Sequence, residues 1–307
     1  MMTKLSRLDI ESLPHYRKKT HREWSAACPQ CNGKDRFIFW PDRGNYYCRR
    51  CDLKGFILET DQALTTPEQR DAWKRAEEER QRKEAMERVD AITRLQGMID
   101  RVIHYHRMVK EALGYWASQG LSSLTIERYQ LGYCPKCPTE PSSASFTIPY
   151  FQNGNLVHLR HRLQTPNGHG KYRPEFAGLG NQLFNSDILK PSDEIPFGLL
   201  EPGECLIVEG EVKAMVLDQI GFSVVGLPGA NSWRGEWGQW FKGQAKVYVA
   251  LDPGVEPMAW RVGGNLKEWG VEVAVCMLPY KPDDMFVLYG ASIEDFIAII
   301  RQGRIIR

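Results

Sequence analysis

The sequence predicts a multidomain α/β protein with four consecutive parts: a small β ribbon, a helical linker, a mixed α+β basic subdomain and a domain built on a Rossmann-like parallel sheet. Two observations predict this fold class. Four cysteines stand in two close pairs near the start of the 307-residue chain, and after residue 200 apolar runs alternate regularly with helical stretches. The expected limits are residues 1–60, 61–107, 108–200 and 201–307.

The first part is a ribbon with two Cys-x-x-Cys pairs. Cys28 and Cys31 form the first pair, and Cys48 and Cys51 form the second, which begins 17 residues after Cys31. Two such pairs separated by a hairpin match a tetrahedral site of four thiolates, so we expect them to bind one structural Zn²⁺. A ribbon of this size buries too little apolar surface to be stable alone, and the metal would supply folding free energy.

Basic and aromatic side chains are interleaved around these cysteines. This combination is typical of surfaces that bind single-stranded DNA, because cations contact the phosphates and aromatic rings stack on bases. The candidate DNA-reading residues are Lys34, Arg36, Phe37, Arg49 and Arg50. A purely structural role for the ribbon is the alternative.

Residues 61–107 are expected to form a helical linker. Pro67 stands in a favourable position for the first turn of a helix. Residues 77–84 are polar on every side, which indicates a solvated helix, whereas apolar residues recur at helical spacing from Val89 onward.

The third part carries cations that are expected to line a groove. Residues 101–180 have a net charge of +5, as do residues 1–60, whereas residues 181–307 have a net charge of −6. Alternate residues of a strand face the same side, so Arg160 and Arg162 should lie together. The candidate nucleotide- and template-binding residues are Arg160, Arg162, Lys171, Arg173 and, in the last part, Lys213. An ordinary solvated basic face is the alternative.

Four further cysteines lie outside the ribbon. Cys134 and Cys137 form a third Cys-x-x-Cys pair without a matching fourth, so we expect reduced loop thiols there, with a second metal as the alternative. Cys205 and Cys276 lie within apolar strand-like runs and are expected in the core.

Acidic residues follow the predicted strands of the last part. Ligands of parallel α/β sheets bind beyond the C-terminal ends of the strands, where Glu209, Asp252 and the pair Asp283 and Asp284 stand. Converging carboxylates suit Mg²⁺ or Mn²⁺, and two such ions can activate a hydroxyl and stabilise a leaving pyrophosphate. Each acid taken alone is equally consistent with a helix N-cap.

The sequence also argues against several classes of protein. No apolar run reaches the ~18–20 residues of a membrane span, and no hydrophobic segment of a secretory signal follows Met1. We therefore expect a cytoplasmic protein with no membrane partner. The motif Gly-x-x-x-x-Gly-Lys-[Ser/Thr] is missing, so nothing in the sequence indicates an ATPase or helicase motor.

Together these motifs resemble the DnaG-type DNA primases of bacteria and phages, and the likeness covers nearly the whole chain. The ribbon is similar to the four-cysteine ribbon of phage primases. The motifs that resemble the basic subdomain of the family are Ile148-Pro149-Tyr150, Arg160-His161-Arg162-Leu163 and Lys171-Tyr172. The motifs that resemble its Toprim fold are Val208-Glu209-Gly210-Glu211, Leu251-Asp252 and Leu278-Pro-Tyr-Lys-Pro-Asp283-Asp284. Each motif is weak alone, and their order and spacing carry the resemblance.

The resemblance implies template-directed synthesis of short RNA primers on single-stranded DNA from ribonucleoside triphosphates, for the initiation of replication. It implies that the ribbon selects a start site and that the Toprim carboxylates bind Mg²⁺, with Glu209, Asp252 and Asp283 as catalytic residues. No helicase or helicase-docking segment is recognisable before Arg307, so we expect a separate replicative helicase as a partner. The phage-like ribbon is consistent with a phage or mobile-element origin.

One position departs from the family pattern. The family usually carries Asp-x-Asp after the third Toprim strand, whereas Asp252 is followed by Pro253 and Gly254. Glu256 can replace the missing carboxylate if the chain turns back; otherwise the affinity for the metal should fall. Two alternatives therefore stay open. One is a primase-like accessory protein that binds single-stranded DNA with impaired catalysis, and the other is a Toprim nuclease or recombination mediator.

Overall fold

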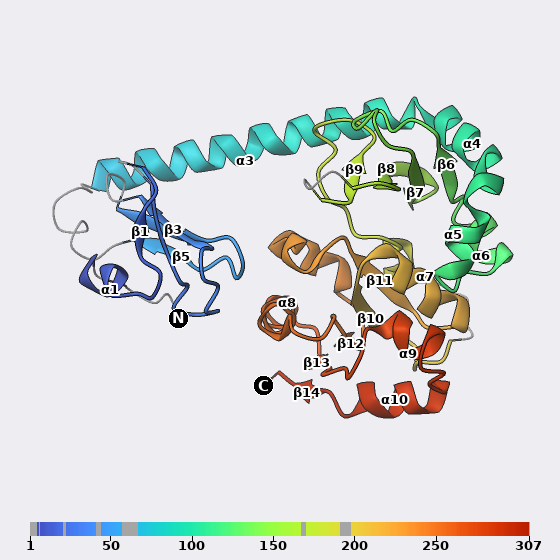
Figure 1. Ribbon diagram of the computed structural model, residues 1–307. Coiled ribbons are helices and arrows are strands. Elements are labelled where there is room, and N and C mark those ends of the chain that lie inside the picture. The colour runs from blue at the N-terminus through green and yellow to red at the C-terminus, as the bar shows by residue number, and fades with distance from the viewer. Residues whose placement is uncertain are drawn as a thin grey trace. The chain divides into compact units, whose positions relative to one another are not determined.

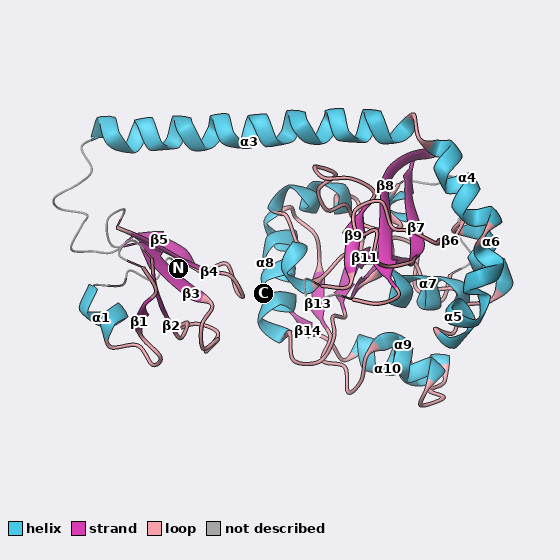
Figure 2. Cartoon of the chain, turned by 45° about the horizontal axis from the view of Figure 1, so that its top comes forward, coloured by secondary structure: helices cyan, strands magenta, loops and turns pink. Residues whose placement is uncertain are grey.

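The computed structural model describes residues 5, 7–20, 23–40, 44–56, 67–166, 170–190 and 198–306. The chain divides into two compact units, Met1–Glu84 and Ala85–Arg307. This division falls within helix α3 (Pro67–Gln96), which Figure 2 shows as one unbroken helix. The expected boundary between residues 60 and 61 lies outside the described residues.

The first unit contains an antiparallel β ribbon, drawn in blue in Figure 1. A short helix, α1 (Arg7–Glu11), precedes the sheet. The strands pair in sequence order and are β1 (Arg17–Lys18), β2 (Trp24–Ala26), β3 (Phe37–Trp40), β4 (Asn45–Cys48) and β5 (Lys54–Phe56). Trp24 and Phe39 pack edge to face in its core, with ring centroids 5.4 Å apart. The predicted ribbon is confirmed.

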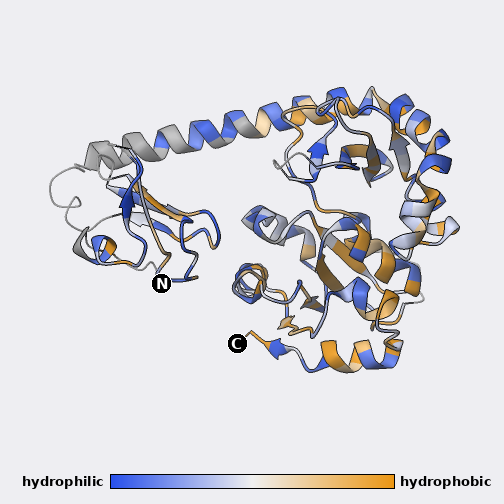
Figure 3. Cartoon of the chain, in the orientation of Figure 1, coloured by the Kyte–Doolittle hydropathy of each residue, from blue (hydrophilic) through white to orange (hydrophobic). Residues whose placement is uncertain are grey.

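Helix α3 and the shorter helix α4 (Ile99–Arg107) form the predicted helical linker. Figure 3 shows α3 as predominantly hydrophilic along its described length. Its C-terminal turns are different, because Ala91 and Leu95 are buried against Val102 and Tyr105 of α4. No helix in the described part of the chain is both long and apolar enough to cross a membrane.

The mixed part combines short helices with a four-stranded antiparallel sheet. Helices α5 (Leu113–Ser118) and α6 (Ser123–Arg128) follow the 3-10 turn η1 (Val109–Ala112). The hydroxyl of Ser122 caps α6 by accepting a hydrogen bond from the Thr125 amide at 3.2 Å. The sheet has the order β6-β7-β8-β9, formed by β6 (Gly132–Cys134), β7 (Ser145–Gln152), β8 (Asn155–Leu163) and β9 (Tyr172–Pro174). The 3-10 turn η2 (Ser186–Leu189) follows.

The last part is the predicted parallel sheet with helices between its strands. The order is β11-β10-β12-β13-β14, and the first four strands are parallel. These strands are β10 (Glu204–Glu209), β11 (Val224–Leu227), β12 (Lys246–Val249) and β13 (Val273–Val275). The intervening helices are α7 (Glu211–Ile220), the 3-10 turns η3 (Ala230–Ser232) and η4 (Gly235–Phe241), α8 (Glu256–Glu268), α9 (Pro282–Val287) and α10 (Ile293–Arg301).

An antiparallel edge strand completes this sheet and was not predicted. Strand β14 (Arg304–Ile305) pairs with β13. Two residues after a helix carry no alternation that could identify a strand, so only the folded chain shows it.

Alternate strand residues supply two separate cores, one on each face of the parallel sheet. Leu206, Val208 and Tyr248 belong to one core, and Ile207 and Val249 belong to the other. Each fully buried aliphatic side chain contributes about 1.5–3 kcal/mol relative to an exposed one. The predicted burial of both faces is thus confirmed, and with it the α/β fold class.

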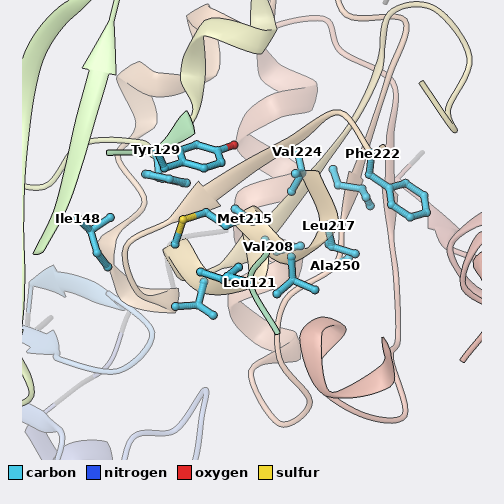
Figure 4. Packing of buried hydrophobic residues seen from close by; sticks show 14 of the residues in the cluster. Leu121, Tyr129, Ile148, Val208, Met215, Leu217, Phe222, Val224 and Ala250 are labelled. Atoms are coloured by element: carbon cyan, nitrogen blue, oxygen red, sulfur yellow. The ribbon is translucent and has the colours of Figure 1, made fainter. Parts of the chain in front are cut away.

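The first of these cores joins the two sheets of the second unit. Ile148 of β7 packs in the same cluster as Val208 of β10 and Met215 of α7, as Figure 4 shows. Because of this shared core, the antiparallel sheet is held against the parallel sheet by apolar packing. The chain leaves β10 for β11 on one side and later returns to β12 on the other, so the strand order reverses at β10. The carboxyl end of such a strand is the usual ligand site.

Candidate active site and metal centres

The four predicted zinc ligands form one compact cluster. Their sulfur atoms all lie within 4.8 Å of one another, with Cys28 Sγ 3.5 Å from Cys51 Sγ and Cys31 Sγ 3.7 Å from Cys48 Sγ. Zinc–sulfur bonds of ~2.3 Å give a tetrahedron with sulfur–sulfur edges of about 3.8 Å, so the cluster fits the ion. Within the described ranges, no other group of three or more Cys, His, Asp or Glu side chains has this spacing. The predicted zinc ribbon is therefore supported by its geometry.

The backbone turns in the same way after each cysteine pair. Asn32 and Asp52, which follow the second cysteines, have φ angles of 53° and 54°. Their amides donate to the carbonyls of Cys28 and Cys48, both at 2.9 Å. Asn and Asp tolerate this left-handed conformation better than most residues do. The short polar residue after each pair thus allows the tight turn that closes the site.

The candidate DNA-reading residues of the ribbon do not share one environment. The four cations are exposed: Lys34, Arg36, Arg49 and Arg50. Phe37 is fully buried and packs against Tyr46 with ring centroids 5.2 Å apart, so the structure places it in the core. A surface pocket beside Lys34 contains residues that sequence reasoning did not select: His15, Tyr16, Arg17 and Asp35.

The predicted catalytic acids follow neighbouring strands of the parallel sheet. Glu209 ends β10, Asp252 follows β12, and Asp283 lies in the first turn of α9, after β13. Strands β10, β12 and β13 are adjacent and parallel, so their carboxyl ends meet at one edge. Asp284 follows Asp283 in the same turn. The structure therefore brings the predicted acids to one side of the sheet.

Two of these acids have carboxylate oxygens that lack a hydrogen-bond partner among the described residues. Asp252 Oδ1 and Asp283 Oδ1 are buried, and neither has a hydrogen-bond partner among the residues that the structure describes. The other oxygen of Asp252, Oδ2, lies 3.2 Å from Lys213 Nζ. Burial raises the pKa of Asp283, and the charge of Lys213 opposes this shift. A hard cation is the kind of ligand that both oxygens would accept.

The acids form an open edge rather than a closed cage. Over the described ranges, no three carboxylates have ligand atoms within 4.8 Å of one another. Mg²⁺ commonly keeps several waters and takes only one or two protein carboxylates, so Asp252 and Asp283, with Glu209 on the adjacent strand, are a suitable set.

The turn after β12 contains the departure from the family pattern. Gly254 has a φ of 87°, larger than the φ of 54° at Asp52, and glycine adopts such an angle without strain. Glu256 does turn back toward this position, and its Oε1 accepts a hydrogen bond from the Gly254 amide at 2.8 Å. This bond lowers the pKa of Glu256. One carboxylate oxygen of Glu256, the candidate replacement for the missing aspartate, is thus bonded to the backbone of the turn.

The predicted basic strand contributes one buried and one partly exposed arginine. Arg160 and Arg162 lie on the same face of β8, as expected. The Arg160 side chain is only 13% exposed; it pairs with the buried Glu211 and donates to the Pro228 carbonyl at 3.0 Å. Tyr150 also donates a hydrogen bond to Glu211. Arg160 therefore braces β8 against the start of α7, and sequence reasoning did not identify Glu211 and Tyr150 as its partners.

Positive charges gather near the acids from several elements. We call Arg162, Lys171, Lys213 and Lys281 the cationic cluster. The pKa of Lys171 is lowered, first by partial burial and then by the charges of the other three members. Arg162 lies on β8 and Lys213 lies on α7, so the members of the cluster come from elements of both sheets of the second unit. Lys281 was not predicted, although it stands two residues before Asp283.

Arg173 has local partners. Its Nη1 donates to the Gly170 carbonyl at 3.1 Å, and its Nη2 lies 3.8 Å from a Glu140 oxygen. Arg173 is therefore tied to its own turn, whereas Lys171, two residues earlier, is exposed.

The third cysteine pair lies in a buried polar network. Cys134 and Cys137 are free thiols and are buried. Near them, His161 Nε2 lies 2.7 Å from Glu175 Oε2, and its Nδ1 lies 2.8 Å from Ser145 Oγ. Burial lowers the pKa of His161, but the hydrogen bonds to the two thiols and to Glu175 together outweigh burial and raise this pKa to about 10. The expected loop position is wrong for Cys134, which ends strand β6, whereas the reduced state stays a prediction. Both thiols are buried, and among the described residues they do not belong to the metal-spaced group.

His158, on the same strand, predicts a pH dependence of stability. It is 5% exposed, and burial, followed by the charge of Arg160, lowers its pKa from 6.5 to about 3. Between pH 6.5 and pH 3, His158 binds a proton in the unfolded chain but stays neutral in the folded chain. The contribution of neutral His158 to the stability of the fold is therefore fully present above pH 6.5 and is lost as the pH falls toward 3. We expect His158 to reduce the free energy of unfolding by up to about 1.4 kcal/mol per pH unit in this range.

Urea unfolding at neutral and mildly acidic pH measures this effect. The matched control is His158→Phe, which keeps a ring beside Tyr150, whose centroid lies 5.1 Å from that of His158. The variant should lose less stability than the wild type on acidification. Equal losses in the two proteins would contradict the assignment.

Comparisons with known proteins agree with this architecture. No family model matches the sequence. The chain is 23% identical to the DNA primase of Chlamydia trachomatis and 22% identical to that of Chlamydia muridarum, and each alignment covers 93% of the chain. The chain spans about half the length of these relatives, 55% in both cases. The resemblance to DNA primases is thus confirmed.

A solved structure shares the fold. The crystal structure of the zinc-binding and RNA polymerase domains of the Aquifex aeolicus primase matches with a TM-score of 0.54 and 18% identity. The match covers 96% of this chain and 82% of that structure. Both parts of the chain, the four-cysteine ribbon and the α/β unit, therefore have counterparts in one known architecture.

Proposed function

We propose that the chain is a DNA-directed RNA polymerase that synthesises short RNA primers on single-stranded DNA from ribonucleoside triphosphates. The observation that carries this proposal is the pairing of two opposite features at one sheet edge. Asp252 and Asp283 offer buried carboxylate oxygens without partners among the described residues, and Lys213 of the cationic cluster lies 3.2 Å from Asp252. Metal ions and phosphates are the ligands that these two features suit.

The residues divide naturally into two tasks. Asp252 and Asp283, with Glu209, would hold Mg²⁺ or Mn²⁺, which would activate the attacking hydroxyl and stabilise the leaving pyrophosphate. Lys213 pairs with Asp252 and faces Asp283, so it keeps their charges balanced until the metal binds. Lys171 and Arg162 would bind nucleotide phosphates or the template backbone, while the buried Arg160 holds β8, the strand of Arg162, in position.

The ribbon would contact the template through its exposed cations. Arg49 and Arg50 directly follow the zinc ligand Cys48, so their backbone is held by the metal site. By extension from the relatives, we propose a cytoplasmic replication protein that works with a separate replicative helicase.

One observation favours a second function. Gly254 stands where the family usually has another aspartate, and Glu256 is already bonded to the turn. Fewer carboxylates would then face the metal, which is the condition expected for a primase-like accessory protein that binds single-stranded DNA but catalyses poorly.

Primer synthesis tests the proposal directly. The protein is incubated with single-stranded DNA, labelled ribonucleoside triphosphates and either Mg²⁺ or Mn²⁺, and the products are separated by length. We expect short RNA that requires all three components. DNA binding without product under either metal would favour the accessory function, and degradation of the DNA would indicate a Toprim nuclease.

A further inference from the structure

Two tyrosines form an exposed stacked pair on either side of helix α9. Tyr280 precedes the helix and Tyr289 follows it, and their ring centroids lie 4.0 Å apart with an interplanar angle of 24°. The two residues are 47% and 58% exposed. Neighbouring Leu288 is 68% exposed, so the aromatic pair belongs to an apolar patch. We call Tyr280 and Tyr289 the tyrosine pair.

The backbone holds this pair beside the candidate metal site. The Tyr289 amide donates to the carbonyl of Asp284 at 3.0 Å, which fixes the end of the helix relative to its first turn. The same first turn carries Asp283, whose Oδ1 is buried. Both rings are therefore positioned by a helix of six residues that also presents a candidate catalytic acid.

Cations adjoin the tyrosine pair as well. Lys281 follows Tyr280 directly, is exposed, and belongs to the cationic cluster together with Lys171 and Lys213. An exposed aromatic surface with an adjoining cation suits a flexible polyanion that carries flat rings. Single-stranded nucleic acid has both properties, since its phosphates meet the cations while its bases stack on aromatic side chains.

We propose that the tyrosine pair is a stacking platform for an unpaired base of the single-stranded DNA template, next to the site of synthesis. The proposal deepens the proposed function, on which it rests for the identity of the strand. Two tyrosines in this position would both bind the base and support one another. Both residues are exposed, so a base can reach the rings, and the stacking of one ring on the other holds both rings in place before DNA binds.

A protein partner is the main competing occupant, because Val287 and Leu288 are also exposed. Charge argues against it in this place. A protein interface is usually depleted of charge at its centre, whereas Lys281 adjoins the rings and Asp283 and Asp284 lie in the same short helix.

Direct binding measurements test the platform without requiring catalysis. The zinc-loaded full chain is titrated with a fluorescently labelled oligothymidylate, and Tyr280→Leu/Tyr289→Leu is compared with Tyr280→Phe/Tyr289→Phe. Because the rings are exposed, both variants should fold. We expect about tenfold weaker binding for the leucine variant and nearly unchanged binding for the phenylalanine variant, which keeps the rings. The comparison is repeated with Arg49→Ala and Arg50→Ala present, to reduce any contribution from the ribbon.

Photo-crosslinking gives the position of the base. An oligonucleotide that contains 5-iododeoxyuridine should crosslink to Tyr280 or Tyr289, as mapped by mass spectrometry of the peptides. Equal affinities of the leucine and phenylalanine variants, or crosslinks confined to other residues, would overturn the proposal. A change in oligomeric state of the leucine variant without a change in DNA affinity would also overturn it, in favour of a protein partner.

The outcomes separate this proposal from the proposed function. Loss of affinity in the leucine variant, together with a wild type that makes no primers, would support the platform and reject the synthesis. Primer synthesis by a leucine variant with unchanged DNA affinity would support the synthesis and reject the platform.

Discussion

Replacement of Cys48 by serine is expected to abolish zinc binding and to unfold the ribbon. The four sulfur atoms lie within 4.8 Å of one another, and a structural zinc of this type supplies ~10–16 kcal/mol in small modules. A core of a few aromatic residues cannot replace that contribution. Zinc content by atomic absorption and near-ultraviolet circular dichroism of the whole chain measure the two effects.

The matched control is Cys276→Ala. Cys276 is equally buried, but it lies in the second unit, where its thiol is 3.5 Å from the carbonyl of Ile300. This variant should keep one zinc per chain. Full zinc content in Cys48→Ser would show that the cluster is not the metal site. A similar loss in both variants would indicate general damage.

Replacement of Asp252 by asparagine is expected to lower primer synthesis by about a thousandfold, which corresponds to about 4 kcal/mol of transition-state stabilisation. Asparagine keeps the shape of the side chain and can still accept from Lys213, but it removes the charge that a divalent cation requires. Initial rates with saturating Mg²⁺ and template measure the effect, and DNA affinity should remain unchanged.

Glu272→Gln is the corresponding control. Glu272 lies just before β13, at the opposite end of the strand from the candidate site, and pairs on the surface with Lys246 at 2.9 Å. An exposed pair of this kind contributes about 0–1 kcal/mol to stability, so the activity should stay close to that of the wild type. If Asp252→Asn kept more than a tenth of the activity, Asp252 would not be a metal ligand in this reaction.

Several features could be predicted because they depend on local sequence. The zinc cluster follows from two Cys-x-x-Cys pairs, since three-residue spacing and a tight turn determine where both thiols of a pair lie. The parallel sheet follows from its alternating apolar strands, and the position of Asp252 follows from the rule that such sheets bind ligands at their carboxyl ends. Each of these inferences needs only neighbouring residues and a known period.

Other features could not be predicted because they depend on contacts between distant elements. Phe37 belongs to an aromatic-rich ribbon, and only the pairing of β3 with β4 shows that its ring points inward. Arg160 is a basic strand residue of the kind that lines a groove, yet the packing of β8 against α7 places Glu211 beside it. Tyr280 and Tyr289 are nine positions apart, and their rings meet only because helix α9 folds between them.

The sequence by itself therefore determined the ligands of the zinc site, the order of the four parts and the strand ends that carry the acids. The tertiary structure decided which charges meet: Lys213 with Asp252, Arg160 with Glu211, and Lys281 with the cationic cluster. The physical reason is the range of the interactions. Turns, periodicity and metal knuckles act over a few residues of chain, whereas ion pairs and aromatic stacking act over a few ångströms of space, and only the folded core brings distant residues that close.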